Sequence, residues 1–405
     1  MGKLVINKDK LTPSVIEELV GICPFGAMEN KNGGLEINAA CKMCKLCVKK
    51  GPEGVVQFIE DKVEEIDKSL WRGISVYVDH VGGNIHPVTY ELIGKARELA
   101  AKINHPVYAV FVGYNIKDKA EELLHYGVDE VFVYDYEDLK DFRIEPYTAA
   151  LEDFINKVKP STLLVGATTV GRSLAPRVAA RFRTGLTADC TVLDMKENTD
   201  LVQIRPAFGG NIMAQILNPN HRPQLATVRY KVMDAPERSE NTSGKINIQH
   251  LDKTKFKSGI KVLRVTKKEI EEEISEADVI VAAGRGVKSE KDLAMIKELA
   301  DLLGGQVATT RPLIEAGWID AKRQIGLSGR TVKPKLIITC GISGSVQFVA
   351  GMNNSDLIIA INKDPKATIF DVAHYGIVGD IYEIIPKLIE NIKSEKGLKG
   401  LYELV

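Results

Sequence analysis

Four cysteines near the N-terminus have the residue type and spacing of ligands for an iron–sulfur cluster. Three of them, Cys41, Cys44 and Cys47, form a C-x2-C-x2-C run, one of the spacings by which proteins hold such clusters. The full run continues with x3-C-P, and its fourth cysteine ligates the other cluster of a pair. Here Gly51 stands at that fourth position, while a separate Cys-Pro pair containing Cys23 lies upstream. The run and Cys23 therefore make one complete set for a single [4Fe–4S] cluster.

The residues upstream of Cys23 support one cluster rather than two. Counting back from Cys23 by the same spacing gives Leu19, Ile16 and Pro13, none of which can ligate iron. Each half of a two-cluster pattern has therefore lost the ligands that served one cluster, and the two losses are complementary. The alternative is a zinc site with four cysteine ligands, but zinc sites usually pair their cysteines in two separated C-x2-C hooks. The spacing favours the iron–sulfur cluster.

Lysines surround the cysteine run, at Lys42, Lys45, Lys49 and Lys50. A group of like charges of this kind is either a solvated face or a docking site for an acidic partner. The sequence leaves both interpretations open.

The rest of the chain offers no side-chain catalyst. Cys190 and Cys340 are isolated, and we expect them to be small apolar residues packed at strand ends rather than thiol switches. The seven histidines have no ligand spacing, and no Ser/His/Asp or paired-carboxylate arrangement is evident. This pattern is typical of a chain whose cofactors carry the chemistry.

Three loops rich in glycine and short polar residues follow predicted strands toward the C-terminus. The first is Val281–Ser289 with Arg285 between two glycines, the second is Thr339–Ser345 and the third is Ala360–Pro365. Glycines let the backbone approach a phosphate, arginine can form a fork to it, and serine hydroxyls and free amides suit a pyrophosphate. Each loop alone could be an ordinary glycine turn. Three in one domain predict a phosphate-bearing cofactor, although no G-x-G-x-x-G fingerprint is present.

Alternating strands and helices must position these loops. Short runs rich in β-branched residues predict strands at 74–78, 107–112, 131–134, 162–165, 279–282, 336–339 and 357–361. Helical spacing predicts helices at 89–103, 149–158, 290–303 and 380–392. The alternation predicts right-handed crossovers and parallel sheets, with ligands at the carboxyl ends of the strands. The breaker-rich stretch 233–258 indicates a linker at a domain boundary.

The length of 405 residues allows two or three domains at roughly 150 residues each. We predict an iron–sulfur domain over 1–66, an α/β domain facing a partner subunit over 70–255, a cofactor domain over 259–392 and a tail over 393–405. The fold class is α/β, with a small ferredoxin-like α+β domain followed by two doubly wound, Rossmann-like parallel-sheet domains.

Composition excludes several functional classes. Fifty-four basic residues balance fifty-four acidic ones, which argues against nucleic acid as a partner. No secretory signal and no apolar run of about 18 residues is present, so we expect no membrane association. We expect a cytoplasmic protein, where thiols stay reduced and clustered cysteines more often hold metal than form disulfides.

The loops and several other segments are similar to those of a known family. Six segments closely resemble the alpha subunit of electron-transferring flavoproteins: Gly171–Pro176, Thr187–Cys190, Arg205–Asn211, Gly341–Gly351, Ala360–Pro365 and Tyr375–Asp380. The resemblance covers about residues 73–392. With its cysteine-bearing unit, the chain resembles the longer alpha subunits of anaerobic bacteria, whose complexes bifurcate electrons.

The resemblance implies a tightly held FAD in the domain 259–392. Arg311, beside Thr310, would lie over the isoalloxazine and raise its electron affinity by its charge. Ser328 takes the place of a threonine that hydrogen-bonds flavin N5 in relatives. Phe348 departs from the family, since many relatives have a histidine there, within reach of the flavin's pyrimidine carbonyl. Phenylalanine cannot donate that hydrogen bond, so we expect Phe348→His to change the flavin's one-electron potentials.

The same resemblance assigns the phosphate and adenosine ends of FAD. Arg285 would serve the phosphate and ribose, Ser343 to Gln347 would wrap the ribityl–pyrophosphate, and Asn362 and Asp380 would hold the adenosine end. The complete set of candidate cofactor-binding residues is Arg285, Thr310, Arg311, Ile325, Gly326, Leu327, Ser328, Ser343, Gly344, Ser345, Val346, Gln347, Phe348, Asn362, Asp380 and Ile381.

The resemblance also implies partners for an electron-carrier subunit that is not an enzyme alone. These are a beta subunit with a second FAD and the NAD site, an acyl-CoA or hydroxy-acid flavin dehydrogenase, and ferredoxin. The C-terminal domain would swivel on the 233–258 linker between partners. Two alternatives stay open: a non-bifurcating flavoprotein with a structural cluster, and a nucleotide-binding regulatory protein with an iron–sulfur sensor.

Overall fold

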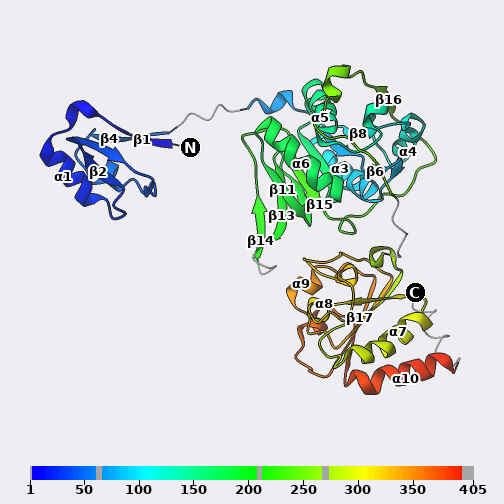
Figure 1. Cartoon of the computed structure of the whole chain (residues 1–405). Coiled ribbons are helices and arrows are strands. Elements are labelled where there is room, and N and C mark those ends of the chain that lie inside the picture. The colour runs from blue at the N-terminus through cyan, green and yellow to red at the C-terminus, as the bar shows by residue number, and fades with distance from the viewer. Residues whose placement is uncertain (1, 61–65, 208–211, 267–272, 395–405) are drawn as a thin grey trace. The chain divides into compact units, whose positions relative to one another are not determined.

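The computed structural model describes the chain apart from residues 1, 61–65, 208–211, 267–272 and 395–405 (Figure 1). The end of the segment Arg205–Asn211 and most of the predicted tail 393–405 therefore lie outside the described residues. The chain divides into two compact units, Met1–Ile66 and Asp67–Val405. Within the described residues, no helix is long and apolar enough to cross a membrane.

The N-terminal unit is a small α+β fold. Its elements are β1 (Gly2–Ile6), α1 (Pro13–Ile22), β2 (Met28–Lys31), β3 (Gly34–Ile37), α2 (Leu46–Lys49) and β4 (Val56–Glu60). β1 pairs antiparallel with β4, and β2 and β3 form a hairpin. α1 begins where the Thr12 side chain accepts a hydrogen bond from the Val15 N–H. The buried Ile16 and Leu19 of α1 pack with Cys47 in one apolar core.

The second unit opens with a seven-stranded, fully parallel sheet. Its strand order is β11-β15-β10-β5-β8-β9-β16. The strands are β5 (Ile74–Tyr77), β8 (Val107–Gly113), β9 (Glu130–Asp135), β10 (Thr162–Gly166), β11 (Leu186–Cys190), β15 (Gln224–Val228) and β16 (Lys245–Ile248). The helices are α3 (Val88–Ile103), α4 (Ala120–Leu124), α5 (Ile144–Val158) and α6 (Thr169–Phe182). These results confirm the predicted alternation of strands and helices.

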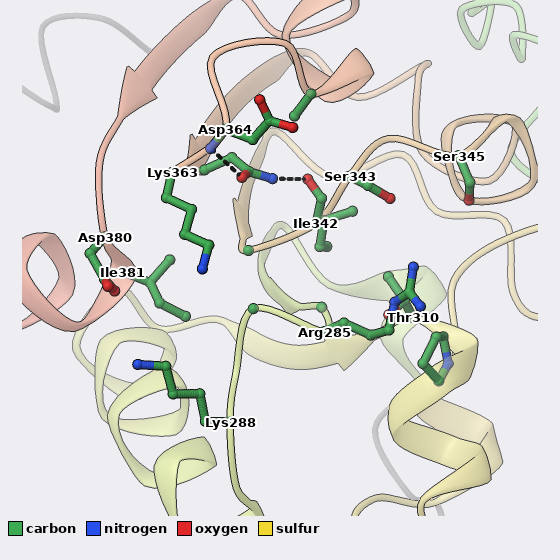
Figure 2. Close-up of a pocket in the computed structure, with 16 residues that line it drawn as sticks. Arg285, Lys288, Thr310, Ile342, Ser343, Ser345, Lys363, Asp364, Asp380 and Ile381 are labelled. Carbon is green, nitrogen blue, oxygen red and sulfur yellow. Dashed lines mark hydrogen bonds between the residues drawn. The ribbon is translucent and has the colours of Figure 1, made fainter.

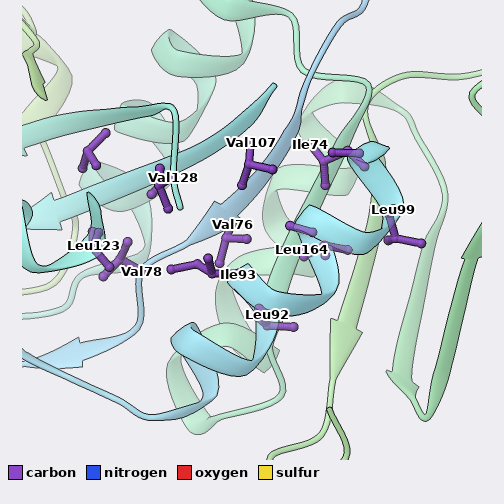
Figure 3. Packing of buried hydrophobic residues seen from close by; sticks show 14 of the residues in the cluster. Ile74, Val76, Val78, Leu92, Ile93, Leu99, Val107, Leu123, Val128 and Leu164 are labelled. Carbon is purple, nitrogen blue, oxygen red and sulfur yellow. The ribbon is translucent and has the colours of Figure 1, made fainter. Parts of the chain in front are cut away.

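Both faces of this sheet are covered, because the helices present apolar stripes to it. One core contains residues of α3 and α4, and the other contains residues of α5 and α6. In Figure 3, Leu92 and Ile93 of α3 lie against Val76 of β5. Spacing of apolar residues at three and four positions places them on one side of a helix, and buried strands of a parallel sheet are apolar on both sides.

A three-stranded antiparallel sheet adjoins the parallel one, and the sequence did not indicate it. It consists of β12 (Val192–Met195), β13 (Leu201–Ala207) and β14 (Ile212–Ile216), in that order. Leu193 and Met195 are buried, whereas Ile212 and Met213 are more than half exposed. β12 is therefore amphipathic, with alternate residues buried and exposed. β14, in contrast, exposes apolar residues to solvent.

The prediction that 233–258 is a free linker is wrong. The segment returns to the middle domain, where β16 pairs in parallel with β9 and completes the sheet. Farther along, Leu251 and Phe256 are 3% and 5% exposed and belong to the core beneath α5. A run of Pro, Ser, Asn and Gly predicts turns, but it does not exclude a short edge strand between them.

The C-terminal part of the second unit is a five-stranded parallel sheet of order β18-β17-β19-β20-β21. The strands are β17 (Val279–Ala283), β18 (Gln306–Thr309), β19 (Leu336–Cys340), β20 (Leu357–Asn362) and β21 (Tyr375–Val378). The helices are α7 (Leu293–Leu302), α8 (Arg311–Glu315), α9 (Val346–Val349) and α10 (Ile381–Lys393). α7 and α10 pack side by side over one face (Figure 1).

A buried carboxylate in α3 gives the second unit a pH-dependent stability. Glu91 is 7% exposed, and it accepts hydrogen bonds from the backbone N–H of Lys231 at 3.0 and 3.2 Å. Burial raises the pKa of Glu91 from its ordinary value of 4.5 to about 7, against the opposing effect of these N–H groups.

We therefore expect the free energy of unfolding to fall as the pH rises from about 4.5 to about 7. Over this interval the folded state binds the proton that the unfolded state has already lost, so the loss is on the order of 3 kcal/mol. Glu91→Gln should flatten this slope, and urea unfolding at pH 5 and pH 7.5 would measure it. An equal slope in the wild type and the variant would contradict the assignment.

Candidate functional site

The carboxyl ends of the C-terminal strands form a pocket of about 420 Å³, within the range of roughly 300–1,000 Å³ typical of ligand sites. Loops after β17, β18, β19 and β20 and the start of α10 supply its walls. The lining residues are Gly284, Arg285, Gly286, Lys288, Thr310, Pro312, Gly341, Ile342, Ser343, Ser345, Asn362, Lys363, Asp364, Ala367, Asp380 and Ile381 (Figure 2).

Three glycines allow two of these loops to touch along their backbones. The Gly286 N–H donates to the Gly341 carbonyl at 2.9 Å, and the Gly284 N–H donates to the Cys340 carbonyl at 3.0 Å. A Cβ on Gly341 would lie 2.7 Å from the Gly286 Cα, and Gly341 has a φ of +62°. A Cβ on Gly284 would lie 2.6 Å from the Gly341 carbonyl oxygen. The floor of the pocket therefore consists of backbone without side chains, which lets a ligand approach closely. The N–H groups of Gly284, Gly286 and Gly341 are themselves bonded within the protein.

Asn362 holds two loops of the pocket in place. Its side chain is nearly buried, and its Nδ2 donates to the Ile342 carbonyl at 2.7 Å. Its Oδ1 accepts from the Asp364 N–H at 3.0 Å, and both bonds appear in Figure 2. Because both ends of the amide are used within the protein, Asn362 positions the loops that would contact an adenosine group. Its side chain therefore has fewer free hydrogen-bonding positions for a direct contact with the adenosine than the sequence suggested.

The pocket carries cations near its rim. Arg285, Lys288 and Lys363 are exposed, and in Figure 2 Arg285 extends toward Thr310, while Lys288 and Lys363 lie on the other side with Asp380. The Lys288 N–H donates to the Tyr382 hydroxyl at 2.7 Å, which ties its loop to α10. Cations beside a floor without side chains provide the electrostatics that a pyrophosphate requires.

The structure brings together some of the predicted cofactor residues. Seven of them line the pocket: Arg285, Thr310, Ser343, Ser345, Asn362, Asp380 and Ile381. The remaining nine lie outside its lining: Arg311, Ile325, Gly326, Leu327, Ser328, Gly344, Val346, Gln347 and Phe348.

The loop of Gly326 to Ser328 is fixed against α9. The Leu327 N–H donates to the Gln347 carbonyl at 2.9 Å, and a Cβ on Gly326 would lie 2.7 Å from that same oxygen. Ser328 is exposed, and its hydroxyl accepts from Gln324 Nε2 at 2.8 Å. These residues form a second group of candidate cofactor contacts, in addition to the residues that line the pocket.

Two further predicted residues have surroundings that the sequence did not indicate. Arg311 is exposed at the first turn of α8 and pairs with Glu315, with 2.8 Å between Nε and Oε1. Phe348 is 4% exposed and packs among Ile325 and Met352 in the core beneath the sheet. In this structure Phe348 is a core residue, and its side chain does not line the pocket.

Sequence reasoning missed Lys288 and Lys363, which both line the pocket. Both lie within predicted loops, Lys288 two residues after Gly286 and Lys363 directly after Asn362. The only available signal was a cation next to a phosphate-type loop, and exposed lysines are too common for that signal to stand out.

The four N-terminal cysteines line one small cavity, together with apolar residues of the unit. The Ala27 N–H points to Cys23 Sγ at 3.3 Å, and the Met43 N–H points to Cys41 Sγ at 3.5 Å. N–H groups aimed at sulfur stabilise the thiolate form that ligates metal. Burial raises the pKa of the Cys47 thiol, which a bound metal would offset.

Two further observations bear on this cavity. Within the described ranges, no three His, Cys, Asp or Glu side chains are arranged to hold one metal ion. A four-iron cluster spreads its ligands over several irons, so its sulfurs need not converge on one point. At Gly51, a Cβ would meet the Cys47 carbonyl and lie 2.6 Å from Leu19, so a fifth cysteine would not fit there.

The remaining two cysteines should be chemically inert. Burial raises the pKa of both Cys190 and Cys340 to about 12, and both side chains are fully buried. At pH 8 both are therefore neutral thiols, and only the thiolate reacts with iodoacetamide. We expect mass spectrometry to find neither residue alkylated in the native protein, while both react in guanidinium. Rapid labelling of Cys190 in the native state would contradict this.

Comparisons with known proteins agree with the fold and the pocket. Residues 74–254 match the family model "Electron transfer flavoprotein domain", and residues 273–353 match "Electron transfer flavoprotein FAD-binding domain". The chain is 64% identical over 98% of its length to the lactate dehydrogenase (NAD(+),ferredoxin) subunit LctC of Acetobacterium woodii, covering 96% of that protein. It is 45% identical over 80% of its length to the electron transfer flavoprotein subunit alpha of Thermoanaerobacterium thermosaccharolyticum, covering 99% of it.

Proposed function

The chain belongs to the alpha-subunit family of electron transfer flavoproteins, and from this premise we propose that it is the FAD-carrying alpha subunit of an electron-bifurcating complex. The observation that carries the proposal is the phosphate-type pocket at the carboxyl edge of the C-terminal sheet, within the matched FAD-binding domain. The bifurcating assignment is supported by the 64% identical relative, whose name includes both NAD and ferredoxin. We place this subunit in the cytoplasm.

FAD fits the pocket by the chemistry of its walls. The glycines Gly284, Gly286 and Gly341 would leave room for the pyrophosphate to approach the pocket floor, with Arg285 and Lys363 neutralising its charge. Ser343 and Ser345 would donate hydroxyl hydrogen bonds. When bound, FAD supplies the ability to accept and release electrons singly.

The flavin ring requires contacts beyond the pocket lining. We assign it to the neighbouring group formed by Arg311 and the loop Gly326–Ser328, which α9 holds in place. Arg311 would favour added negative charge on the ring, provided that its ion pair with Glu315 opens. Ser328 can donate its hydroxyl hydrogen while it accepts from Gln324.

We assign one [4Fe–4S] cluster to Cys23, Cys41, Cys44 and Cys47. Their shared cavity and the N–H groups directed at two of the sulfurs support this assignment. The cluster would connect the complex to ferredoxin. The beta subunit would supply the second FAD and the NAD site, and a flavin dehydrogenase acting on a hydroxy acid or an acyl-CoA would be the other partner.

The test is anaerobic purification of the chain with its beta subunit, followed by flavin and iron counts. We expect stoichiometric FAD on this chain and about four irons per chain. We also expect NAD reduction by a dehydrogenase substrate that depends on reduced ferredoxin. NAD reduction that does not depend on ferredoxin would favour a non-bifurcating flavoprotein, and absence of FAD would overturn the proposal and favour a regulatory protein.

A further inference from the structure

The seven-stranded sheet has a cavity at its own carboxyl edge, separate from the pocket of the C-terminal sheet. From β5 the chain runs to β8 and β9 on one side, and then to β10 on the other side of β5. In open α/β sheets, ligands bind where the chain changes sides in this way. A cavity of about 360 Å³ lies there, lined by the loops that follow β5, β10 and β15. The pocket of the C-terminal sheet has the same location, beside the ends of β17 and β19.

A buried carboxylate in this cavity lacks a full set of hydrogen-bond partners. Asp79, two residues after β5, is 4% exposed and lines the cavity. The Thr168 hydroxyl donates to its Oδ2, and its Oδ1 has no hydrogen-bond partner among the described residues. Burial raises the pKa of Asp79, against the opposing effect of the Thr168 hydrogen bond. A buried acceptor without a partner costs free energy, so Oδ1 is available to a hydroxyl group of a ligand.

A histidine ring lines the same cavity and offers a donor to it. His86 Nδ1 accepts from the Val88 N–H at 3.1 Å, so the hydrogen of the neutral ring is on Nε2. The ring packs edge-on against Tyr230, with 5.0 Å between the ring centres, which holds it in place. Nε2 has no hydrogen-bond partner within the described part of the chain. A free donor and a free acceptor in one cavity suit hydroxyl groups, which both donate and accept.

Two arginines give part of the cavity wall a positive charge. Arg172, the fourth residue of α6, and Arg229, directly after β15, both line the cavity. They share one carboxylate, because Asp189 lies 3.1 Å from Arg172 Nη2 and 3.2 Å from Arg229 Nη2. A single carboxylate cannot neutralise two guanidinium groups, so this pair retains a net positive charge. The planar guanidinium group matches the geometry of a phosphate.

The other charged residues of the lining are matched in pairs. Glu273 lies 3.7 Å from Arg330, and Glu276 lies 3.5 Å from Lys231. The positive charge of the cavity is therefore located at the two arginines that share Asp189. The cavity thus offers one kind of partner to a phosphate and another, at Asp79 and His86, to hydroxyl groups.

We propose that this cavity binds a sugar phosphate, either free or as part of a mononucleotide, in addition to the FAD of the C-terminal pocket. Arg172 and Arg229 would bind the phosphate. Asp79 Oδ1 and His86 Nε2 would bind the sugar hydroxyls, as an acidic residue does with ribose in dinucleotide-binding folds. The volume lies within the range of roughly 300–1,000 Å³ typical of small-molecule sites. An inorganic anion would leave Asp79 unused, and an unphosphorylated nucleoside would leave the arginines unused.

The experiment is calorimetry on the FAD-loaded complex of the chain with its beta subunit, with ribose 5-phosphate, AMP, adenosine and inorganic phosphate as probes. Arg172→Gln is the test variant and Arg181→Gln is its matched control. Both arginines are exposed on α6 and pair with a carboxylate, Arg181 with Glu152 at 3.0 Å, but only Arg172 lines the cavity. We expect Arg172→Gln to weaken ribose 5-phosphate binding by about tenfold, and Arg181→Gln to change it less than about twofold.

Asp79→Asn tests the hydroxyl contact separately. It should weaken binding of ribose 5-phosphate and leave binding of inorganic phosphate within about twofold, and unchanged affinity for ribose 5-phosphate would refute the sugar assignment. Tighter binding of AMP than of ribose 5-phosphate would identify a nucleotide as the ligand, and equal affinity would identify a free sugar phosphate.

Only binding that depends on Arg172 is assigned to this cavity, which excludes contributions from the beta subunit. Equal affinity for ribose 5-phosphate in Arg172→Gln and Arg181→Gln would overturn the site. Failure of the wild type to bind ribose 5-phosphate or AMP at millimolar concentration would also overturn it. FAD is counted in every sample, so a failure of the proposed FAD site is distinguished from a failure of this one.

Discussion

Gly341→Ala should deprive the protein of its FAD while leaving the N-terminal unit intact. The added Cβ would lie 2.7 Å from the Gly286 Cα, so the two loops that form the pocket floor must separate. The φ of +62° at Gly341 adds backbone strain of about 1–3 kcal/mol for an alanine. Since about 1.4 kcal/mol is a factor of ten in affinity, a loop separation that costs about 3 kcal/mol should weaken FAD binding by about a hundredfold.

Gly304→Ala is the matched control for this experiment. Gly304 also has a positive φ, +64°, but an added Cβ there meets no atom within 4 Å. Both variants thus impose similar backbone strain, and only Gly341→Ala disturbs the pocket. Flavin fluorescence after gel filtration would measure retained FAD. Retention of FAD by Gly341→Ala at the level of Gly304→Ala would show that the cofactor does not rest on this floor.

Cys44→Ser should remove the iron from the protein without removing the flavin. Cys44 is exposed, so serine creates no packing defect, and the change tests ligation alone. With three cysteines left, we expect the iron content to fall from about four per chain to well below one. A unit of about sixty residues has a small apolar core and often depends on a metal, so it should also unfold at lower temperature.

Met43→Ala is the control for the cysteine variant. Met43 is the neighbouring exposed residue, and the backbone N–H that it directs at Cys41 Sγ is retained in the variant. The variant removes the side-chain Sδ, which lies 3.9 Å from Cys41 Sγ and is not one of the four proposed ligands. This variant should keep its iron, and both variants should keep FAD, because the segment that matches the FAD-binding domain belongs to the other unit. Iron analysis and the optical spectrum of anaerobically purified protein give the readout. Full iron in Cys44→Ser would disprove the four-cysteine assignment.

Much of the fold followed from the sequence, because buried parallel strands are conspicuous. Runs such as 279–282 and 357–361 consist almost entirely of apolar residues, as strands covered on both faces must. Two of the strands that escaped prediction lack this property. All four residues of β21 are exposed, and β16 is an edge strand with two partly buried residues. The position of β21 depends on its pairing with β20, and the position of β16 depends on its pairing with β9, which lies far earlier in the chain.

The candidate site was predictable where backbone geometry determines it. Glycines after strands identified the loops that meet at Gly286 and Gly341, because parallel strands bring their carboxyl ends to one edge. The surroundings of individual side chains were harder to predict from the sequence. The burial of Phe348 depends on how α9 packs against Ile325 and Met352, and no local pattern encodes that packing.

The late position of β16 has a consequence for synthesis of the chain. The N-terminal unit is complete once β4 has paired with β1, by residue 60. In the second unit, β9 ends at Asp135 but acquires its outer neighbour only when Lys245–Ile248 emerge. At roughly 5–20 residues per second, that interval is on the order of ten seconds on the ribosome. For that time β9 is an unprotected sheet edge, which makes the nascent chain a substrate for chaperones and sensitive to slowed or truncated translation in this region.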